Sequence, residues 1–124
     1  MNIPIGGNIG VELTLQIKQG ADFVLEILLT DSTTGAPFNT APYNAVANLR
    51  KKPFAVPITP FVCTFPTLGT LRIELARTTT AALTCGANLD DDASMYVWDL
   101  ELVTISTNVV TPAFFGDVLV FRNL

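Results

Sequence analysis

Residues 19–31 read QGADFVLEILLTD, with apolar side chains at every second position of the central part. Successive side chains of a β-strand point to opposite faces. One face therefore carries four apolar residues: Phe23, Leu25, Ile27 and Leu29. A turn-forming stretch, STTGAP, follows at residues 32–37. The pattern predicts a half-buried strand that belongs to a β-rich fold.

The same alternation recurs along the chain, with turn signals roughly every ten residues. Strands are predicted at residues 11–18, 23–30, 43–51, 61–65, 70–76, 95–103, 109–115 and 117–122, the last two being split by Gly116. One short helical turn is predicted at residues 77–86, capped by a threonine and ended by Gly86. This set predicts an all-β fold, an antiparallel sandwich or barrel. The expected class is an antiparallel β-sandwich, either immunoglobulin-like or jelly-roll-like.

The chain of 124 residues is long enough for one compact core. Residues 1–10 mix glycines and a proline with isoleucines, so they predict an extended N-terminal arm in front of a single domain at residues 11–124. Prolines stand at positions 53, 57, 60 and 66. Because proline cannot donate to a strand ladder, this stretch is predicted to be edge and loop.

The formal charge of −4 argues against sequence-independent binding of nucleic acid. The basic cluster Arg50-Lys51-Lys52 is short and is interpreted as a solvated strand end or turn. We expect a soluble protein without a membrane partner, since no signal-peptide pattern and no stretch apolar enough to span a bilayer is found.

Catalysis is not expected, because the chain has no histidine to act as a general base or to activate a serine or cysteine. Cys63 and Cys85 are interpreted as buried free thiols rather than a disulfide. The acidic run at residues 90–92, with Asn88, could offer oxygens to calcium, but consecutive residues cannot converge on one ion, and a solvated turn is favoured. We expect no metal and no cofactor.

Asp99 and Glu101 lie on one face of the strand predicted at residues 95–103. Paired carboxylates can carry out acid–base work on a sugar. No further acid, carboxylate pair or aromatic platform accompanies them in the sequence, so the two are interpreted as part of a solvated outer strand face.

The order and spacing of these segments resemble small β-sandwich virion proteins of tailed bacteriophages, including the N-terminal modules of baseplate and tail-fibre proteins. The segments that carry the resemblance are QGADF at 19–23, TD at 30–31, GAPF at 35–38, Tyr43, LRK at 49–51, GTLRIEL at 69–75, the threonine–alanine turn before Leu83, YVWDLEL at 96–102 and GDVLV at 116–120.

The resemblance implies a non-enzymatic structural protein of the virion, assembled in the host cytoplasm. Its expected place is the tail, baseplate or fibre attachment region, with capsid decoration as the alternative and a carbohydrate- or receptor-binding module as a more remote one. The expected partners are other virion proteins and copies of itself. The residues expected to contact other subunits are Ile3, Ile5 and Ile9 in the arm, and Phe54, Val56 and Phe61 in the proline-rich stretch.

Overall fold

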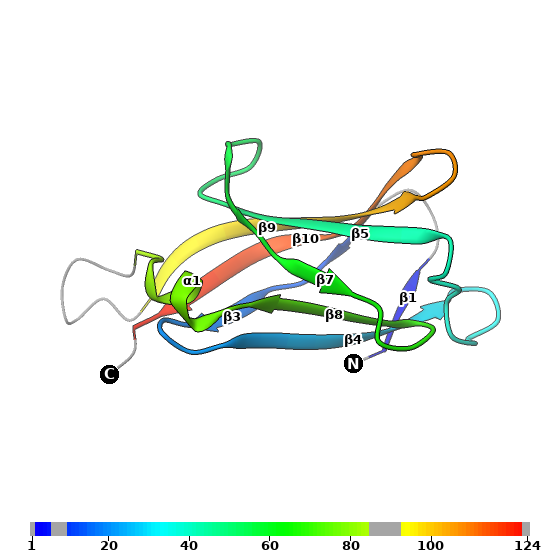
Figure 1. Ribbon diagram of the computed structural model, residues 1–124, viewed down its shortest axis with the longest axis horizontal. Coiled ribbons are helices and arrows are strands. Elements are labelled where there is room, and N and C mark those ends of the chain that lie inside the picture. Colours follow the sequence, from blue (N-terminus) through cyan, green and yellow to red (C-terminus); the bar gives the residue numbers. More distant parts are fainter. Residues whose placement is uncertain (1, 6–9, 85–92, 123–124) are drawn as a thin grey trace.

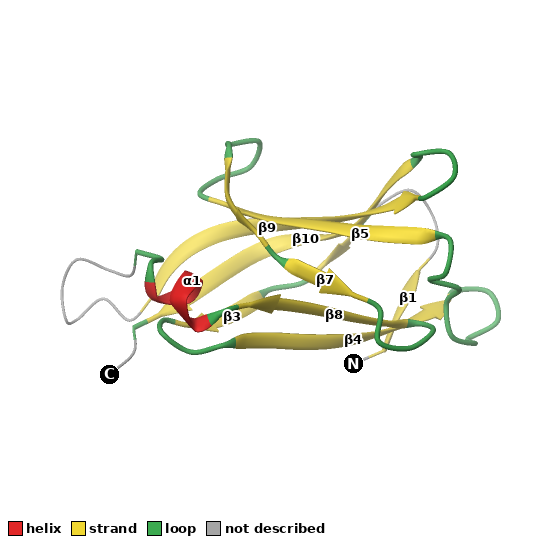
Figure 2. Cartoon of the chain, in the orientation of Figure 1, coloured by secondary structure: helices red, strands yellow, loops and turns green. Residues whose placement is uncertain are grey.

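The protein is a β-sandwich of two packed sheets, shown here by a computed structural model that describes residues 2–5, 10–84 and 93–122. One sheet runs in the order β1 (Asn2–Ile5), β4 (Phe23–Asp31), β8 (Thr70–Leu75) and β7 (Val62–Thr64). The other runs in the order β2 (Val11–Glu12), β10 (Val110–Phe121), β9 (Ala93–Thr104), β5 (Tyr43–Arg50) and β6 (Pro57–Pro60), and β3 (Leu15–Lys18) also pairs with β10. The two layers lie one above the other in Figure 1, and Figure 2 shows one short helix, α1 (Arg77–Ala81), at one end. The predicted all-β sandwich is confirmed.

The strand order distinguishes between the two sandwich types that the sequence left open. Antiparallel pairs join β5 to β6, β7 to β8 and β9 to β10, while the chain changes sheets between β4 and β5, β6 and β7, and β8 and β9. This is the arrangement of a variable-type immunoglobulin sandwich, with β4, β8 and β7 in one sheet and β10, β9, β5 and β6 in the other. The fold is therefore immunoglobulin-like.

The core lies between the inward faces of both sheets. Phe23, Leu25, Ile27 and Leu29 share the inner face of β4, and the last two are almost completely buried. On the opposite sheet, the ring of Trp98 lies 6.1 Å from Phe114 and 6.0 Å from Phe61. The Phe61 ring also lies 6.1 Å from Phe23 of β4, so these rings connect the two layers, and the apolar area that they remove from water stabilises the sandwich.

The strand predicted at residues 11–18 is interrupted, which corrects the sequence interpretation. It forms β2 and β3, and Leu13 lies between them. The backbone N–H of Leu13 donates to Phe115 O at 2.9 Å, but its carbonyl accepts from the indole N–H of Trp98 at 2.8 Å. The indole N–H of Trp98 therefore occupies the Leu13 carbonyl, which an unbroken strand would use for backbone pairing.

The two strands predicted on either side of Gly116 are one continuous strand, β10, so that prediction was wrong. Gly116 remains paired with Trp98 on β9, at a φ of 155°. A Cβ at this position would lie 2.3 Å from the carbonyl oxygen of Leu13. The glycine is required by the close passage of Leu13 over the strand, and the ladder continues through it.

The short helix α1 is capped differently from the prediction. Its first position is preceded by Ala76, which makes no side-chain cap bond, and the helix ends at Ala81. Asp22, at the start of β4, accepts from the backbone N–H of Arg77 at 2.8 Å and from its guanidinium at 3.0 Å. These hydrogen bonds hold the pKa of the Asp22 carboxyl below its usual value. Gly86, the predicted end of the turn, lies outside the described residues.

The proline-rich stretch supplies an outer strand to each sheet, β6 to one and β7 to the other. β6, which begins at Pro57 and ends at Pro60, is the outer strand of its sheet, as predicted.

The N-terminal residues also form a strand. β1 pairs in parallel with β4, with Asn2 opposite Leu28 and Ile5 opposite Asp31. The sequence predicted an arm without regular structure at residues 1–10, whereas residues 2–5 extend a sheet of their own chain.

Candidate functional site

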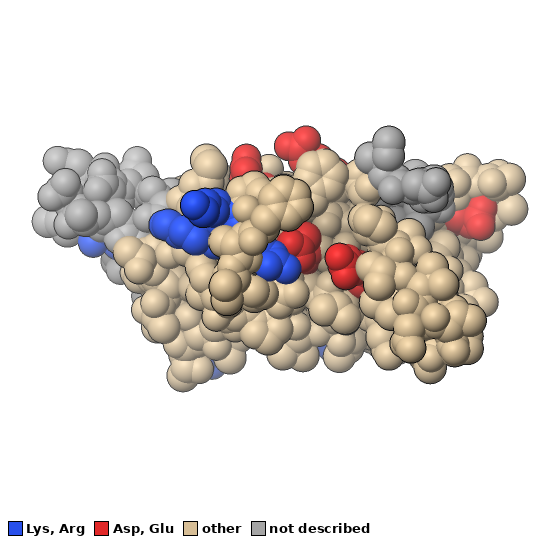
Figure 3. Space-filling view, turned by 90° about the horizontal axis from the view of Figure 1, so that it is seen from above, with Lys and Arg blue, Asp and Glu red and all other residues tan. Residues whose placement is uncertain are grey.

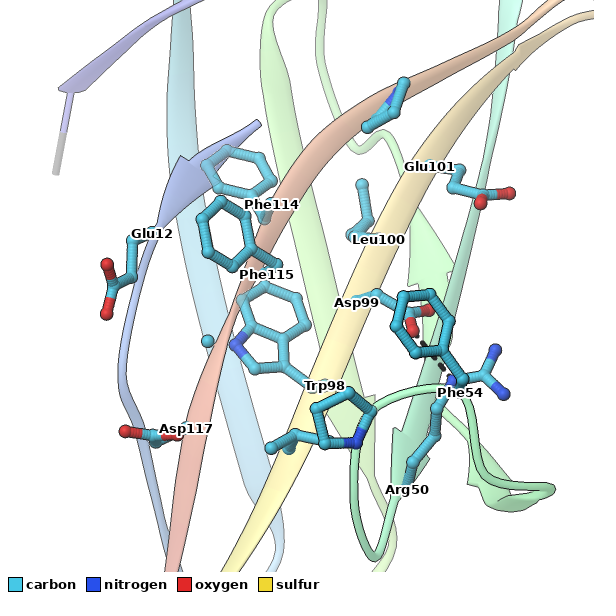
Figure 4. A pocket seen from close by; sticks show the side chains of 14 residues that line it. Glu12, Arg50, Phe54, Trp98, Asp99, Leu100, Glu101, Phe114, Phe115 and Asp117 are labelled. Atoms are coloured by element: carbon cyan, nitrogen blue, oxygen red, sulfur yellow. Dashed lines mark hydrogen bonds and ion pairs between the residues drawn. The ribbon is translucent and has the colours of Figure 1, made fainter. Parts of the chain in front are cut away.

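The outer face of β5, β9 and β10 carries a groove of about 690 Å³. Strand pairing places its side chains in lateral rows. In one row Asp99 lies between Asn48 of β5 and Phe115 of β10, and in the next Glu101 lies between Val46 and Pro112. Outward positions of neighbouring strands are thereby assembled into one surface (Figure 4).

The predicted outward position of Asp99 and Glu101 is confirmed, since both are partly exposed and alternate with the buried Trp98, Leu100 and Leu102. They do not form a free carboxylate pair. The Nε of Arg50 donates to Asp99 Oδ2 at 2.7 Å, which neutralises that carboxylate. That bridge engages one of the two carboxylates on which the sugar chemistry considered above depends.

Arg50 also shapes the wall of the groove. Its Nη1 donates to the carbonyl of Ala55 at 2.6 Å, so one guanidinium joins β9 to the loop between β5 and β6. In that loop Phe54 has a φ of 64° and a fully exposed side chain. Figure 4 shows the Phe54 ring beside Asp99 and Arg50. The hydrogen bond from Arg50 to the Ala55 carbonyl explains how the loop is held. The neighbouring sequence gives no reason for the exposure of Phe54.

Two further acids line the opposite side of the groove. Glu12 of β2 is opposite Phe115, and Asp117 of β10 is opposite Val97. Figure 4 shows both on the far side of Phe115 from Arg50. Sequence reasoning missed Glu12, Asp117 and Phe115 as neighbours of Asp99, because strand register is not visible in the sequence. The pairing of β10 with β9 brings Phe115 and Asp117 to Asp99, and the parallel pairing of β2 with β10 adds Glu12.

The charge on this face is unevenly distributed. Figure 3 views it from above, and shows Lys and Arg gathered on one side with Asp and Glu spread over the remainder. Lys51 and Lys52 are exposed in the turn after β5, as predicted for a strand end, and Lys51 Nζ lies 4.6 Å from the centre of the Tyr96 ring. The two lysines thus form a solvated turn beside the acidic groove, while Arg50, the last residue of β5, is part of the groove itself.

In the part of the chain that the structure describes, no three histidine, cysteine or acidic side chains lie close enough together to hold a metal ion. The acidic run at residues 90–92, considered above for calcium, lies outside the described residues. Cys63 is a free thiol, and burial raises its pKa to about 11. Its expected partner in the alternative disulfide, Cys85, also lies outside the described residues.

The proposed contact residues are placed unequally by the fold. Phe54 is fully exposed and Val56 is 85% exposed, so both can meet a partner. Phe61 is only 5% exposed and packs edge-on against Phe23 and Trp98, so its assignment as a contact is corrected to a core role. Ile3 and Ile5 belong to β1, and Ile9 lies outside the described residues.

The arrangement offers a surface for the recognition of a ligand. Apolar rings, three carboxylates outside the Arg50 bridge and a firmly held loop suit contact with a cationic or amphipathic partner. Among the described residues, no helix is sufficiently long and apolar to cross a membrane.

No protein-family model matches the chain, and a search of curated proteins finds no match.

Proposed function

We propose that this protein is a non-enzymatic structural subunit of a tailed-phage particle, an assembly or adaptor protein of the tail, baseplate or fibre attachment region. The observation that carries the proposal is the preformed face over β5, β9 and β10, where Arg50 holds the fully exposed Phe54 beside a groove. A loop whose backbone is already held loses less entropy on binding than a free loop, and its exposed aromatic ring remains available to a partner, which suits a permanent protein contact.

The rest of the same face supports a role in assembly. Outward positions on its strands carry apolar side chains that are about half exposed, namely Val46, Met95, Val110 and Phe115. Scattered apolar residues are normal on a protein surface, but a set that surrounds a groove marks an interaction site. Other virion proteins are the partners proposed for this face.

Gold-labelled antibodies raised against the purified chain test the proposal on intact particles of the phage that encodes it. Label at the tail or baseplate end supports the proposed place. Label distributed over the head contradicts that place and favours the capsid-decoration alternative. Absence of the protein from washed particles, with the chain present in the infected cell, overturns the virion role altogether.

A glycan-binding module is a second candidate, because Phe54 and Phe115 are exposed beside Asp99 and Glu12, a combination used to stack and hydrogen-bond sugars. A glycan array probed with the purified chain and with Phe54→Ala decides it. Saturable binding that is lost in the variant supports this candidate. An array without bound glycans removes it.

A further inference from the structure

Three carboxylates in the groove lack a cationic partner in the described part of the chain. Arg50 pairs with Asp99, and the remaining ion pairs lie on the other sheet and at α1. Glu12, Glu101 and Asp117 line the groove without such a contact. Charges that line a partly enclosed apolar surface are screened less than isolated surface charges, so they favour a cation that reaches them.

Aromatic groups accompany these acids. Phe115 is 44% exposed and stands between Glu12 and Asp99 in the lateral row of the sheet, while Phe54 projects from the opposite wall. A guanidinium is planar, stacks on aromatic faces and at the same time donates a pair of hydrogen bonds to a carboxylate. The groove therefore presents both of the groups that an arginine side chain recognises.

We propose that this groove binds an extended, arginine-bearing segment of a partner protein. The inference rests on the proposed function, for which it names the chemistry of the partner. Arginine side chains of that segment pair with Glu101 and Asp117 and stack on Phe54 and Phe115, and neighbouring apolar residues of the segment cover the rest of the groove. Pairing of this kind sets specificity and the rate of association as well as affinity.

Charge complementarity selects a basic segment over a second copy of the chain. The whole chain carries a formal charge of −4. A two-fold contact between identical faces brings each patch against its own counterpart, so the unpaired acids of both copies would be drawn together. Like charges that are brought together in a contact cost free energy, whereas arginines from a different protein complement them.

Selection from a random peptide library tests this proposal with the purified full-length chain immobilised. We expect enriched peptides to combine arginine with aliphatic or aromatic residues. The affinity of the best peptide is then measured by fluorescence anisotropy for the natural chain and for Glu101→Gln/Asp117→Asn. The double variant should bind about tenfold more weakly, and added salt should weaken binding to the natural chain more than to the variant.

The matched control is Glu26→Gln/Glu74→Gln, which removes two carboxylates from the outer face of the other sheet and changes the net charge equally. It should retain the affinity of the natural chain. Urea unfolding of each variant, followed by Trp98 fluorescence, establishes that all of them are folded. Phe54→Ala, at a side chain that packs on nothing in the isolated domain, should also weaken peptide binding.

Three results overturn the inference. The first is a library without arginine enrichment. The second is an equal loss of affinity in both double variants, which means general attraction to an acidic protein. The third is sedimentation of the natural chain as a dimer that Phe54→Ala dissociates, since the groove then holds a second copy. Peptide binding without virion label refutes the proposed function alone, and virion label without peptide binding refutes this inference alone.

Discussion

At the scale of single residues, Gly116 shows how one backbone position permits a contact between distant parts of the chain. It lies in the middle of β10, where the absent side chain leaves room for the carbonyl of Leu13. That carbonyl in turn accepts from the indole N–H of Trp98. The single hydrogen-bond donor of a buried tryptophan is satisfied because a glycine lies beside it.

Replacing Gly116 with alanine should destabilise the fold by about 2–4 kcal/mol, because the new Cβ overlaps the Leu13 backbone and strains an unusual φ. Urea unfolding gives the loss, and Trp98 fluorescence should shift as its hydrogen bond is disturbed. Gly35→Ala is the control: that glycine has a φ of 73° but nothing within 4 Å, so the expected cost is only about 1 kcal/mol. Equal losses at both positions would show that steric overlap is unimportant.

The Cys63 thiol gives a second prediction at this scale. Burial raises its pKa to about 11, so at about pH 8 very little thiolate is present and labelling by a thiol reagent should be slow. In a Cys85→Ser background, unfolding in urea should accelerate the labelling strongly. Because the folded state favours the neutral thiol, its contribution to stability is complete below pH 9.0, the unperturbed pKa, and declines as the pH rises toward 11. Native labelling as fast as unfolded labelling contradicts this prediction.

At the scale of elements, α1 holds the turn between β3 and β4, which is distant from it in sequence. Thr80 is completely buried, donates its hydroxyl to Ala21 O at 2.8 Å and accepts from Gly20 N at 3.1 Å. The Nε2 of Gln19 also donates to the carbonyl of Leu83 at 2.7 Å, just after the helix. The turn between β3 and β4 is thus secured by a helix that lies about sixty residues further along the chain.

Thr80→Val keeps the shape of the side chain but removes the buried hydroxyl that accepts from Gly20 N–H and donates to Ala21 O. The expected loss is about 1–3 kcal/mol in urea unfolding. Thr78→Val, at an exposed position of the same helix, controls for the change in helix propensity and should cost much less. Amide hydrogen exchange at Gly20 should be faster in Thr80→Val and unchanged in Thr78→Val, which would assign the loss of stability to the hydrogen bond between Gly20 and Thr80. A loss of unfolding free energy at position 78 as large as that at position 80 would refute the role of Thr80 in holding the turn.

At the scale of the whole molecule, the limits of sequence interpretation follow from the range of each interaction. Alternation is a local property, so the inward face of β4 and the outward acids of β9 could be predicted. The break at Leu13 depends on Trp98, and the cap of α1 depends on Asp22, both far away in sequence.

Phe61 was misplaced for a related reason, because a phenylalanine among prolines suggests an exposed loop. In the structure it links β6 of one sheet to β7 of the other. At this crossing its ring turns inward and packs against Phe23 and Trp98 in the core, two partners that lie far away in the sequence. The groove was unpredictable in the same way, since Glu12 and Asp117 become neighbours only through the register of β2 on β10.

Deleting residues 2–5 should convert β4 into an edge strand and promote self-association, because the backbone groups that pair with β1 become available. Light scattering and sedimentation measure the association. Adding Leu28→Lys to the deletion places a charge on this strand and should restore the monomer. A deletion that remains monomeric without the lysine would mean that β1 has no protective role.

The parallel alignment of the N-terminal strands with β10 has a mechanical consequence. Val11 pairs with Phe114 and Lys18 with Phe121, so the start of β2 and the end of β10 lie at opposite ends of one joint. Tension applied to the two ends of the chain loads the hydrogen bonds of this joint in shear, all at once, instead of peeling them apart one by one. A sandwich connected in this way transmits a pulling force along its length before it ruptures.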